Sequence, residues 1–252
     1  MEEYDAGAFW NDVGRQLLQR PSSDQSTIAS DDTTYYALKQ RRFFAEFLDP
    51  ALRDASSVLE IGPGPGGNLS RLRAQGKVVH GADVSSSMRE IARRNGLDCI
   101  ELMDGKCLPF EDRSVDAVFT STVLQHNDDE HAASLLAEMA RVAAREVHLF
   151  EDTAPVPVRD RRSHWLRRPA WYSSRLRPLG YELTLQRRLP LTCQEIAATA
   201  ARVLMDRHLP QGADPTPKRL HTEEMMLRVA RPIDRVIPPA VGLTRLSFRR
   251  IG

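Results

Sequence analysis

A short apolar strand that runs into a glycine-rich loop constrains this chain more than any other feature. Residues 58–68 read Val-Leu-Glu-Ile-Gly-Pro-Gly-Pro-Gly-Gly-Asn, so the acid Glu60 stands just before the glycines. Gly62, Gly64 and Gly67 have the spacing of a dinucleotide-binding loop, in which missing Cβ atoms let the backbone turn sharply and approach a ligand. The spacing therefore predicts a nucleoside cofactor, and by itself it leaves NAD open.

Two prolines within the loop argue against a ligand with phosphate groups. Pro63 and Pro65 have no N–H, so the loop lacks two of the donors that a pyrophosphate would use. S-adenosylmethionine (SAM) carries no phosphate, and its ribose and amino-acid ends need carboxylates and carbonyls instead. Glu60 supplies such a carboxylate, and the loop therefore favours SAM.

The loop resembles the first motif of the class I SAM-dependent methyltransferases, acid-x-Gly-x-Gly-x-Gly, here residues 60–66. The resemblance extends over about residues 55–155 and includes three further landmarks in order. A strand at 78–82 ends in Asp83, which can accept hydrogen bonds from both ribose hydroxyls. A strand at 99–103 ends in Asp104-Gly105, where the family places an adenine contact. The strand 115–120 leads into loop 121–126, which the family places beneath the methionine moiety.

The resemblance also implies a fold and a set of cofactor residues. The predicted fold class is α/β, a seven-stranded Rossmann-like sheet that is mostly parallel, with an antiparallel last strand, helices on both faces and a helical cap. The implied cofactor contacts are Glu60, Gly62, Gly64, Gly66, Asp83, Val84, Met88, Asp104, Gly105 and Thr120. An N-terminal tyrosine touches the methionine carboxylate in several relatives, so Tyr36 is added to this set.

The chain is expected to form one domain in three parts. Residues 1–52 form an N-terminal helical cap with helices at 8–18 and 33–48, and residues 53–155 form the SAM-binding core. Residues 156–252 complete the sheet, with an aromatic and arginine-rich helix at 163–172 and strands at 180–185 and 243–248. Helices at 192–207 and 222–233 lie in an insertion of about 190–240, which exceeds the usual connection and is expected to act as a substrate lid.

Composition narrows the class of protein further. The three cysteines form no CxxC pair, and no apolar run approaches the roughly 18 residues of a membrane span, so we expect a cytoplasmic protein. Charge is divided unevenly: residues 1–154 hold 16 Lys+Arg and 26 Asp+Glu, whereas residues 155–252 hold 19 and 8. The basic half leaves open an RNA or protein substrate, although no nucleic-acid recognition module is evident and such a partner is not expected.

The candidate catalytic residues follow the fourth and fifth strands. His126 lies where the methyl group would emerge, and a histidine is well suited to remove a proton from a hydroxyl group near neutral pH. Asp152 is the second candidate. Glu151 and Asp152, with Asp128, are hard oxygen donors that could hold Mg²⁺.

The sequence therefore predicts a SAM-dependent methyltransferase for a small or medium-sized acceptor. A hydroxyl group of a sugar, glycoside or secondary metabolite is favoured, because His126 and the acids after the fifth strand suit oxygen. Alternatives are N- or C-methylation of a metabolite, methylation of RNA or protein, a NAD-dependent oxidoreductase and a non-catalytic SAM-binding partner.

Overall fold

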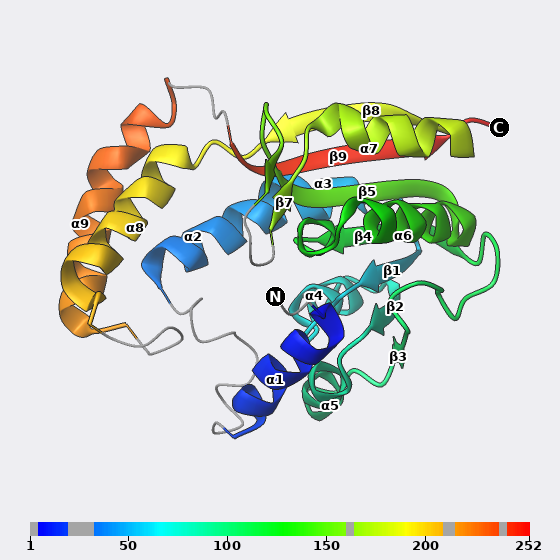
Figure 1. The fold of residues 1–252 in the computed structure, drawn as a ribbon, viewed down its shortest axis with the longest axis horizontal. Helices are drawn as coiled ribbons and strands as arrows, with labels where there is room; N and C mark the ends of the chain where they lie inside the picture. Colours follow the sequence, from blue (N-terminus) through cyan, green and yellow to red (C-terminus); the bar gives the residue numbers. More distant parts are fainter. Residues whose placement is uncertain (1–4, 20–32, 160–163, 209–214, 237–240) are drawn as a thin grey trace.

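The computed structural model describes residues 5–19, 33–159, 164–208, 215–236 and 241–252. Seven strands form one sheet in the order β3-β2-β1-β4-β5-β9-β8 (Figure 1). Their bounds are β1 Ser57–Ile61, β2 Val78–Asp83, β3 Ile100–Leu102, β4 Val115–Ser121, β5 Ala143–Thr153, β8 Tyr181–Arg188 and β9 Gly242–Arg250. Strand β9 runs antiparallel to both neighbours, and the pairs from β3 to β5 are parallel. The predicted fold class is confirmed.

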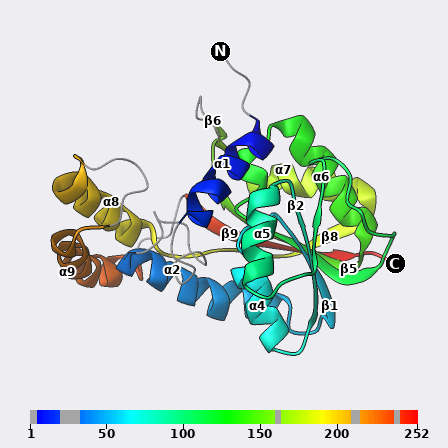
Figure 2. The ribbon, with the colours of Figure 1, turned by 90° about the horizontal axis from the view of Figure 1, so that it is seen from below.

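Helices cover both faces of the sheet (Figure 2). Helices α4 (Gly67–Ala74) and α5 (Ser86–Arg94) lie on one side, and α6 (Asp129–Val142) and α7 (Pro169–Leu176) lie on the other. The central strands are apolar toward both layers, as expected for parallel strands buried on two faces. In β1, for example, Val58 packs in one cluster and Leu59 in the other.

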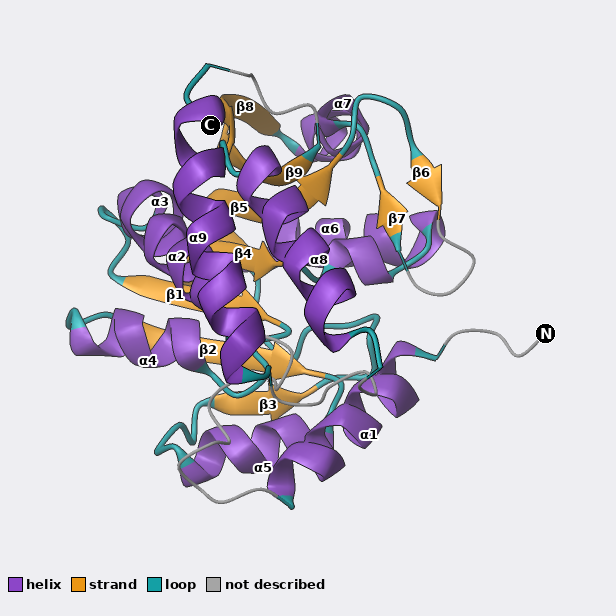
Figure 3. Cartoon of the chain, turned by 90° about the vertical axis from the view of Figure 1, so that its left-hand side faces the viewer, coloured by secondary structure: helices purple, strands orange, loops and turns teal. Residues whose placement is uncertain are grey.

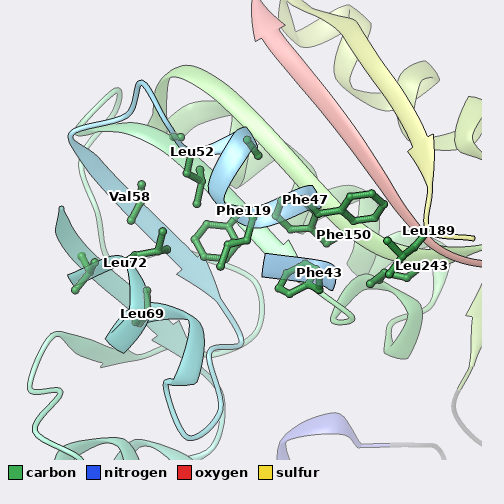
Figure 4. Packing of buried hydrophobic residues seen from close by; sticks show 14 of the residues in the cluster. Phe43, Phe47, Leu52, Val58, Leu69, Leu72, Phe119, Phe150, Leu189 and Leu243 are labelled. Atoms are coloured by element: carbon green, nitrogen blue, oxygen red, sulfur yellow. The ribbon is translucent and has the colours of Figure 1, made fainter. Parts of the chain in front are cut away.

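The N-terminal cap completes the first of these layers. Helix α2 (Thr34–Phe43) passes through a π-helical turn, Phe44–Leu48, into the short α3 (Asp49–Ala51). Figure 4 shows Phe43 and Phe47 gathered against Phe119 of β4 and Phe150 of β5. Helix α1 (Ala6–Leu18) instead packs on α5 through a separate small cluster. The cap is therefore built into the apolar core.

The predicted insertion contains two helices, α8 (Thr192–Asp206) and α9 (Pro217–Ile233). They lie side by side, away from the sheet and next to α2 (Figures 1 and 3). The backbone N–H of Tyr35 in α2 donates to the fully buried carboxylate of Glu223 in α9, at 2.7 Å. The insertion is thus tied to the first turn of α2.

Several predicted elements differ from the structure. The predicted helix at 163–172 is wrong over its first half: Trp165–Leu166 is a strand, β7, paired with β6 (Val158–Arg159), and helix α7 begins only at Pro169. Arg168, just before that proline, is extended, as pre-proline residues prefer. Glu151 and Asp152, expected after the fifth strand, lie within β5, because β9 pairs with this strand as far as Thr153. Residues 20–32, between the two predicted N-terminal helices, and 209–214, within the predicted insertion, lie outside the described residues.

Two smaller differences concern helix ends, and one finding concerns membranes. The predicted helix 33–48 is interrupted by the π-helical turn, and the predicted helix 222–233 begins at Pro217, where Thr216 provides the N-cap. Across the described ranges, no helix is long and apolar enough to cross a membrane.

Candidate functional site

A cavity of about 420 Å³ lies at the carboxyl ends of β1, β2, β4 and β5. Ligands of open α/β sheets bind at this edge, and the volume falls within the about 300–1,000 Å³ of small-molecule sites. Helices α1 and α2 contribute the wall opposite the strands. Ten of the predicted site residues line the cavity: Tyr36, Glu60, Gly62, Gly64, Asp83, Val84, Met88, Gly105, His126 and Asp152. Gly66, Asp104, Thr120 and Glu151 are not among the lining residues.

The glycines of the loop have different tasks. Gly64 has φ +54°, and a Cβ placed on it would meet nothing within 4 Å, so it borders the open cavity. A Cβ on Gly62 would come within 2.7 Å of Cγ2 of Val123 in the loop after β4. Gly66 has φ +86° and caps α4, and its Cβ would lie 2.1 Å from Cδ1 of the buried Leu97. Gly66 therefore serves the packing of the loop rather than the cavity wall.

Asp83 connects the glycine loop with the end of β2. Its Oδ2 accepts the N–H of Gly64 at 3.0 Å, and its Oδ1 accepts the N–H of Ser85 at 2.8 Å. Burial raises the pKa of Asp83, and the N–H groups oppose this rise. The carboxylate is thus fixed at the cavity wall, where it could also accept hydrogen bonds from ribose hydroxyls.

Glu60 is a buried acid with one unused oxygen. Oε1 accepts a hydrogen bond from Nδ2 of Asn68 at 2.7 Å, whereas Oε2 has no hydrogen-bond partner among the described residues. Burial, assisted by the charge of Asp83, raises the pKa of Glu60 to about 8. A buried acceptor without a partner is costly unless a ligand completes it. The ammonium group of SAM is such a donor, so this end of the cavity fits the predicted cofactor.

His126 lines the cavity from the 3₁₀ turn η4 (Leu124–His126) that follows β4. Its ring packs edge-on between Trp10 of α1, with centroids 5.6 Å apart, and His164, with centroids 4.6 Å apart. Asp152 also lines the cavity, and its backbone N–H donates to Oε1 of Gln125 at 3.0 Å. The two predicted catalytic residues therefore share one cavity with the cofactor residues.

Several residues of the cavity wall were not predicted from the sequence. Helix α2 presents Tyr36, Lys39, Gln40 and Phe43 to the cavity, at i, i+3, i+4 and i+7 of one helix face. This helical spacing could have identified Lys39, Gln40 and Phe43 in the sequence, because Tyr36 was already a predicted cofactor contact. Trp10 and Gln125 carried no comparable signal, because their places depend on how α1 packs and on the turn after β4.

The predicted magnesium donors have other contacts. Glu151 is fully buried and accepts the backbone N–H groups of Val123 and Gln125, and burial raises the pKa of Glu151 to about 7. Asp128 caps helix α6 by accepting the N–H of His131. Within the described ranges, no three or more His, Cys, Asp or Glu side chains are grouped so that they could hold a metal ion. Glu151 thus has a structural task in the turn after β4, and its predicted contact with a metal stays a prediction.

Two predicted cofactor residues lie just behind the cavity wall. Asp104 accepts the N–H groups of Lys106 and Cys107, at 2.8 and 2.9 Å, and so shapes the turn after β3 that places Gly105 at the wall. Thr120 is fully buried within β4. Their predicted contacts with the cofactor stay predictions.

Known proteins match both the sequence and the fold. Residues 59–150 match the methyltransferase domain family model. An uncharacterized methyltransferase of Geobacillus sp. (strain WCH70) is 30% identical over 163 residues, which cover 60% of this chain and 72% of that protein. The geranyl diphosphate C-methyltransferase of Streptomyces coelicolor A3(2) shares the fold, with a TM-score of 0.61, 14% identity and coverage of 98% and 100%.

The [4+2]-cyclase SpnF shares it too, with a TM-score of 0.65, 16% identity and coverage of 98% of this chain and 96% of the cyclase. At such identities the likeness concerns the fold alone, and a cyclase with this fold shows that the fold is not restricted to methyl transfer. The family match, together with the Glu60 to Gly66 motif, decides between SAM and the nicotinamide cofactors. The chain belongs to the class I SAM-dependent methyltransferases.

Proposed function

We propose that this enzyme transfers the methyl group of SAM to a hydroxyl group of a small acceptor, with His126 as the general base. The observation that carries the proposal is the position of His126, which lines the same cavity as Glu60 and Asp83, from the turn after β4. Bound SAM supplies a methyl group on a sulfonium, which is open to displacement by a nucleophilic oxygen. A hydroxyl needs help with its proton, and an imidazole of ordinary pKa near 6.5 is suited to accept it.

The remaining wall residues have positioning tasks in this proposal. Asp152 accepts a hydrogen bond from a second hydroxyl of the acceptor and so orients it toward His126. Trp10 and Tyr36 supply aromatic surface beside the reacting groups, as in most small-molecule sites. Much of the rate of a displacement at carbon comes from holding the acceptor in line with the bond that breaks.

The size of the cavity, about 420 Å³, also favours a small acceptor over RNA or protein. The basic C-terminal half, which raised that alternative, uses many of its arginines within the molecule. Arg187 pairs with Glu46 at 2.6 Å, and Arg249 pairs with Glu146 at 2.8 Å. Both pairs join the basic half of the sequence to the acidic half, so the charge asymmetry has an internal explanation.

The insertion supports the site without lining it. None of the described residues of α8 and α9 is among the cavity-lining residues, and the helices reach the site through α2. In the proposal, the insertion therefore acts on the site through α2. It sets the position of this helix and so of Tyr36, Lys39 and Gln40, which line the cavity.

The test is an acceptor screen that detects S-adenosylhomocysteine (SAH) release, beginning with glycosides and phenols. With the acceptor found, His126→Ala is expected to lower turnover roughly 100-fold and to leave SAH affinity unchanged. His131→Ala is the matched control, because His131 lies on the exposed surface of α6 and pairs with Asp128. Normal turnover in His126→Ala would refute the base, and activity that EDTA abolishes and magnesium restores would assign proton removal to a metal instead.

A further inference from the structure

The turn after β4 is held by a buried acid on one side. Glu151 lies in β5 and is fully buried. Its Oε1 accepts the backbone N–H of Val123 at 3.1 Å, and its Oε2 accepts the backbone N–H of Gln125 at 3.3 Å. Both oxygens of the carboxylate are therefore committed to the first N–H groups of the turn.

A buried cation holds the other side of the same turn. Arg167 directly follows β7 and is only 3% exposed. Its Nη1 donates to the carbonyl of Leu124 at 2.7 Å and its Nη2 to the carbonyl of Asn127 at 2.5 Å. Its Nε donates to Oδ1 of Asp129 at 2.7 Å, in the first turn of α6. A short 3₁₀ turn leaves backbone N–H and carbonyl groups unpaired. Here Glu151 accepts from the N–H groups, and Arg167 donates to the carbonyls.

Arg167 is itself rigidly placed. Its guanidinium lies over the ring of Trp171 in α7, 4.6 Å from the centroid. Its backbone carbonyl accepts the N–H of Ala154 at 3.2 Å, beside a bridge between Arg167 and Thr153 at the end of β5. The acid and the cation that hold the turn are therefore both anchored to β5, one within the strand and one just beyond it.

The turn has hydrogen bonds of its own, from the N–H groups of His126 and Asn127 to the carbonyls of Val123 and Leu124, but it also contains a strained residue. Thr122 has φ +58°, in the left-handed region that residues with a Cβ seldom adopt, and such strain persists only where the surroundings enforce it. Gln125, His126 and Asn127 all line the cavity from this turn. A catalytic group has to be held within about 0.5 Å by the packing and hydrogen bonds around it.

We propose that Glu151 and Arg167 form a buried clamp that positions the turn of residues 122–127, and with it His126, for methyl transfer. The positioning part of this inference rests on the proposed function of His126. Neither clamp residue lines the cavity, so both act through the turn, and Arg167 is a positioning residue.

The test compares two arginines that share Trp171. Arg167→Met removes the guanidinium and keeps an apolar side chain. Arg175→Met is the matched control, because Arg175 also lies over the Trp171 ring, at 5.0 Å, but hydrogen-bonds to Ser174 and not to the turn. Three measurements need no acceptor: amide hydrogen exchange of residues 122–127, the NMR titration of the His126 ring, and calorimetry with SAH.

Arg167→Met is expected to speed exchange in the turn about tenfold or more and to move the His126 titration, because the turn opens locally. Affinity for SAH is expected to change less than about threefold, since Glu60 and Asp83 lie on other elements. With the acceptor from the screen, kcat falls about tenfold and KM for SAM stays nearly constant, and Arg167→Lys restores part of the loss. Arg175→Met shows none of these changes.

The clamp would be overturned if Arg167→Met showed the same amide exchange in residues 122–127 and the same His126 titration as Arg175→Met. If Arg167→Met does not fold, Arg167→Lys replaces it in the test, because an ammonium group cannot donate to both carbonyls as the guanidinium does. Amide exchange in Arg167→Lys at the wild-type rate would also overturn the clamp. Normal turnover in His126→Ala would instead break the proposed function and leave the exchange result standing, so the two failures are distinguishable.

Discussion

Two parts of the cavity wall are built in different ways. Around Glu60 and Asp83, where SAM is expected, the polar contacts lie within residues 60–85: Asn68 donates to Glu60, and Gly64 and Ser85 donate to Asp83. Around His126, where we propose that the acceptor binds, the ring packs against Trp10 and His164, and these three residues are far apart in the chain. The first part is thus specified by one continuous stretch, whereas the second depends on how the cap, the turn after β4 and the paired strands β6 and β7 come together.

The largest effects are expected at two glycines of the loop. An added methyl group should lower mainly stability at Gly66 and mainly cofactor affinity at Gly64. Gly66→Ala adds a Cβ in the left-handed region and against buried Leu97, so it is expected to lower the free energy of unfolding by about 3 kcal/mol. Gly64→Ala meets open space and costs only the backbone strain, about 1 kcal/mol, but it points a methyl group into the cavity.

Chemical denaturation with and without SAH checks both glycine variants. Gly66→Ala should unfold at lower denaturant and bind SAH normally while folded, whereas Gly64→Ala should keep most of its stability and lose affinity. Equal stability losses in the two variants would contradict the division of tasks within the loop.

Asp83→Ala comes next in expected size. The variant loses the hydrogen bonds that the Asp83 carboxylate is expected to accept from the ribose hydroxyls. SAH binding should weaken by about 2 kcal/mol or more, roughly 30-fold. Calorimetry measures the change, and Glu90→Gln serves as the control because Glu90 lies on the surface of α5 and pairs with Arg93 and Arg94. Unchanged affinity in Asp83→Ala would remove Asp83 from the cofactor site and leave it a loop contact of Gly64 and Ser85.

Glu60→Gln should have its smallest effect on stability near pH 4.5, and the effect should grow as the pH rises and level off above about pH 8. The pKa of Glu60 is about 8 in the folded chain against the ordinary 4.5, so the folded protein holds this proton over a pH range in which the unfolded chain has released it. Stability from this group is therefore full below about pH 4.5 and is lost as the pH rises toward and through 8. Glutamine removes that loss, because it does not titrate.

Thermal melting of cofactor-free protein between about pH 5 and pH 9 measures the difference between the wild type and Glu60→Gln. Other titrating groups, such as Glu151, are common to both proteins and cancel in the comparison. We expect the melting curves to diverge with rising pH, in favour of the variant, and parallel curves would show that Glu60 does not titrate in this range.

The same contrast explains which parts of the fold could be predicted from the sequence. The sheet, the glycine loop and the Asp83 position follow from short apolar runs and their end residues, which act locally. Glu151 was predicted as a metal ligand because it ends a predicted strand, yet β9 extends β5 and the side chain points at the turn after β4. That task depends on a pairing between residues nearly 100 positions apart, for which the sequence carries no pattern.

The hairpin before α7 is a different case, because a local signal was present. Pro169 disfavours a helical conformation at Arg168, and a proline is well accommodated in the first turn of a helix. A helix from 169 onward was therefore predictable, and so was the extended segment that places Arg167. The acceptors that its guanidinium reaches in the turn after β4 and in α6, in contrast, were not predictable, since they lie about 40 residues earlier in the chain.

The bond between Tyr35 and Glu223 has a consequence for anyone who wishes to alter the acceptor range of this enzyme by exchanging parts with a relative. Glu223 accepts the hydrogen bond of the Tyr35 N–H in the first turn of α2, and Tyr36, the next residue of that turn, lines the cavity. If α8 and α9 were replaced by helices with no acid at this position, the Tyr35 N–H would be buried without a hydrogen-bond acceptor. Transplanted modules must therefore be cut so that Glu223 and α2 travel together, although the two are 188 residues apart in the chain.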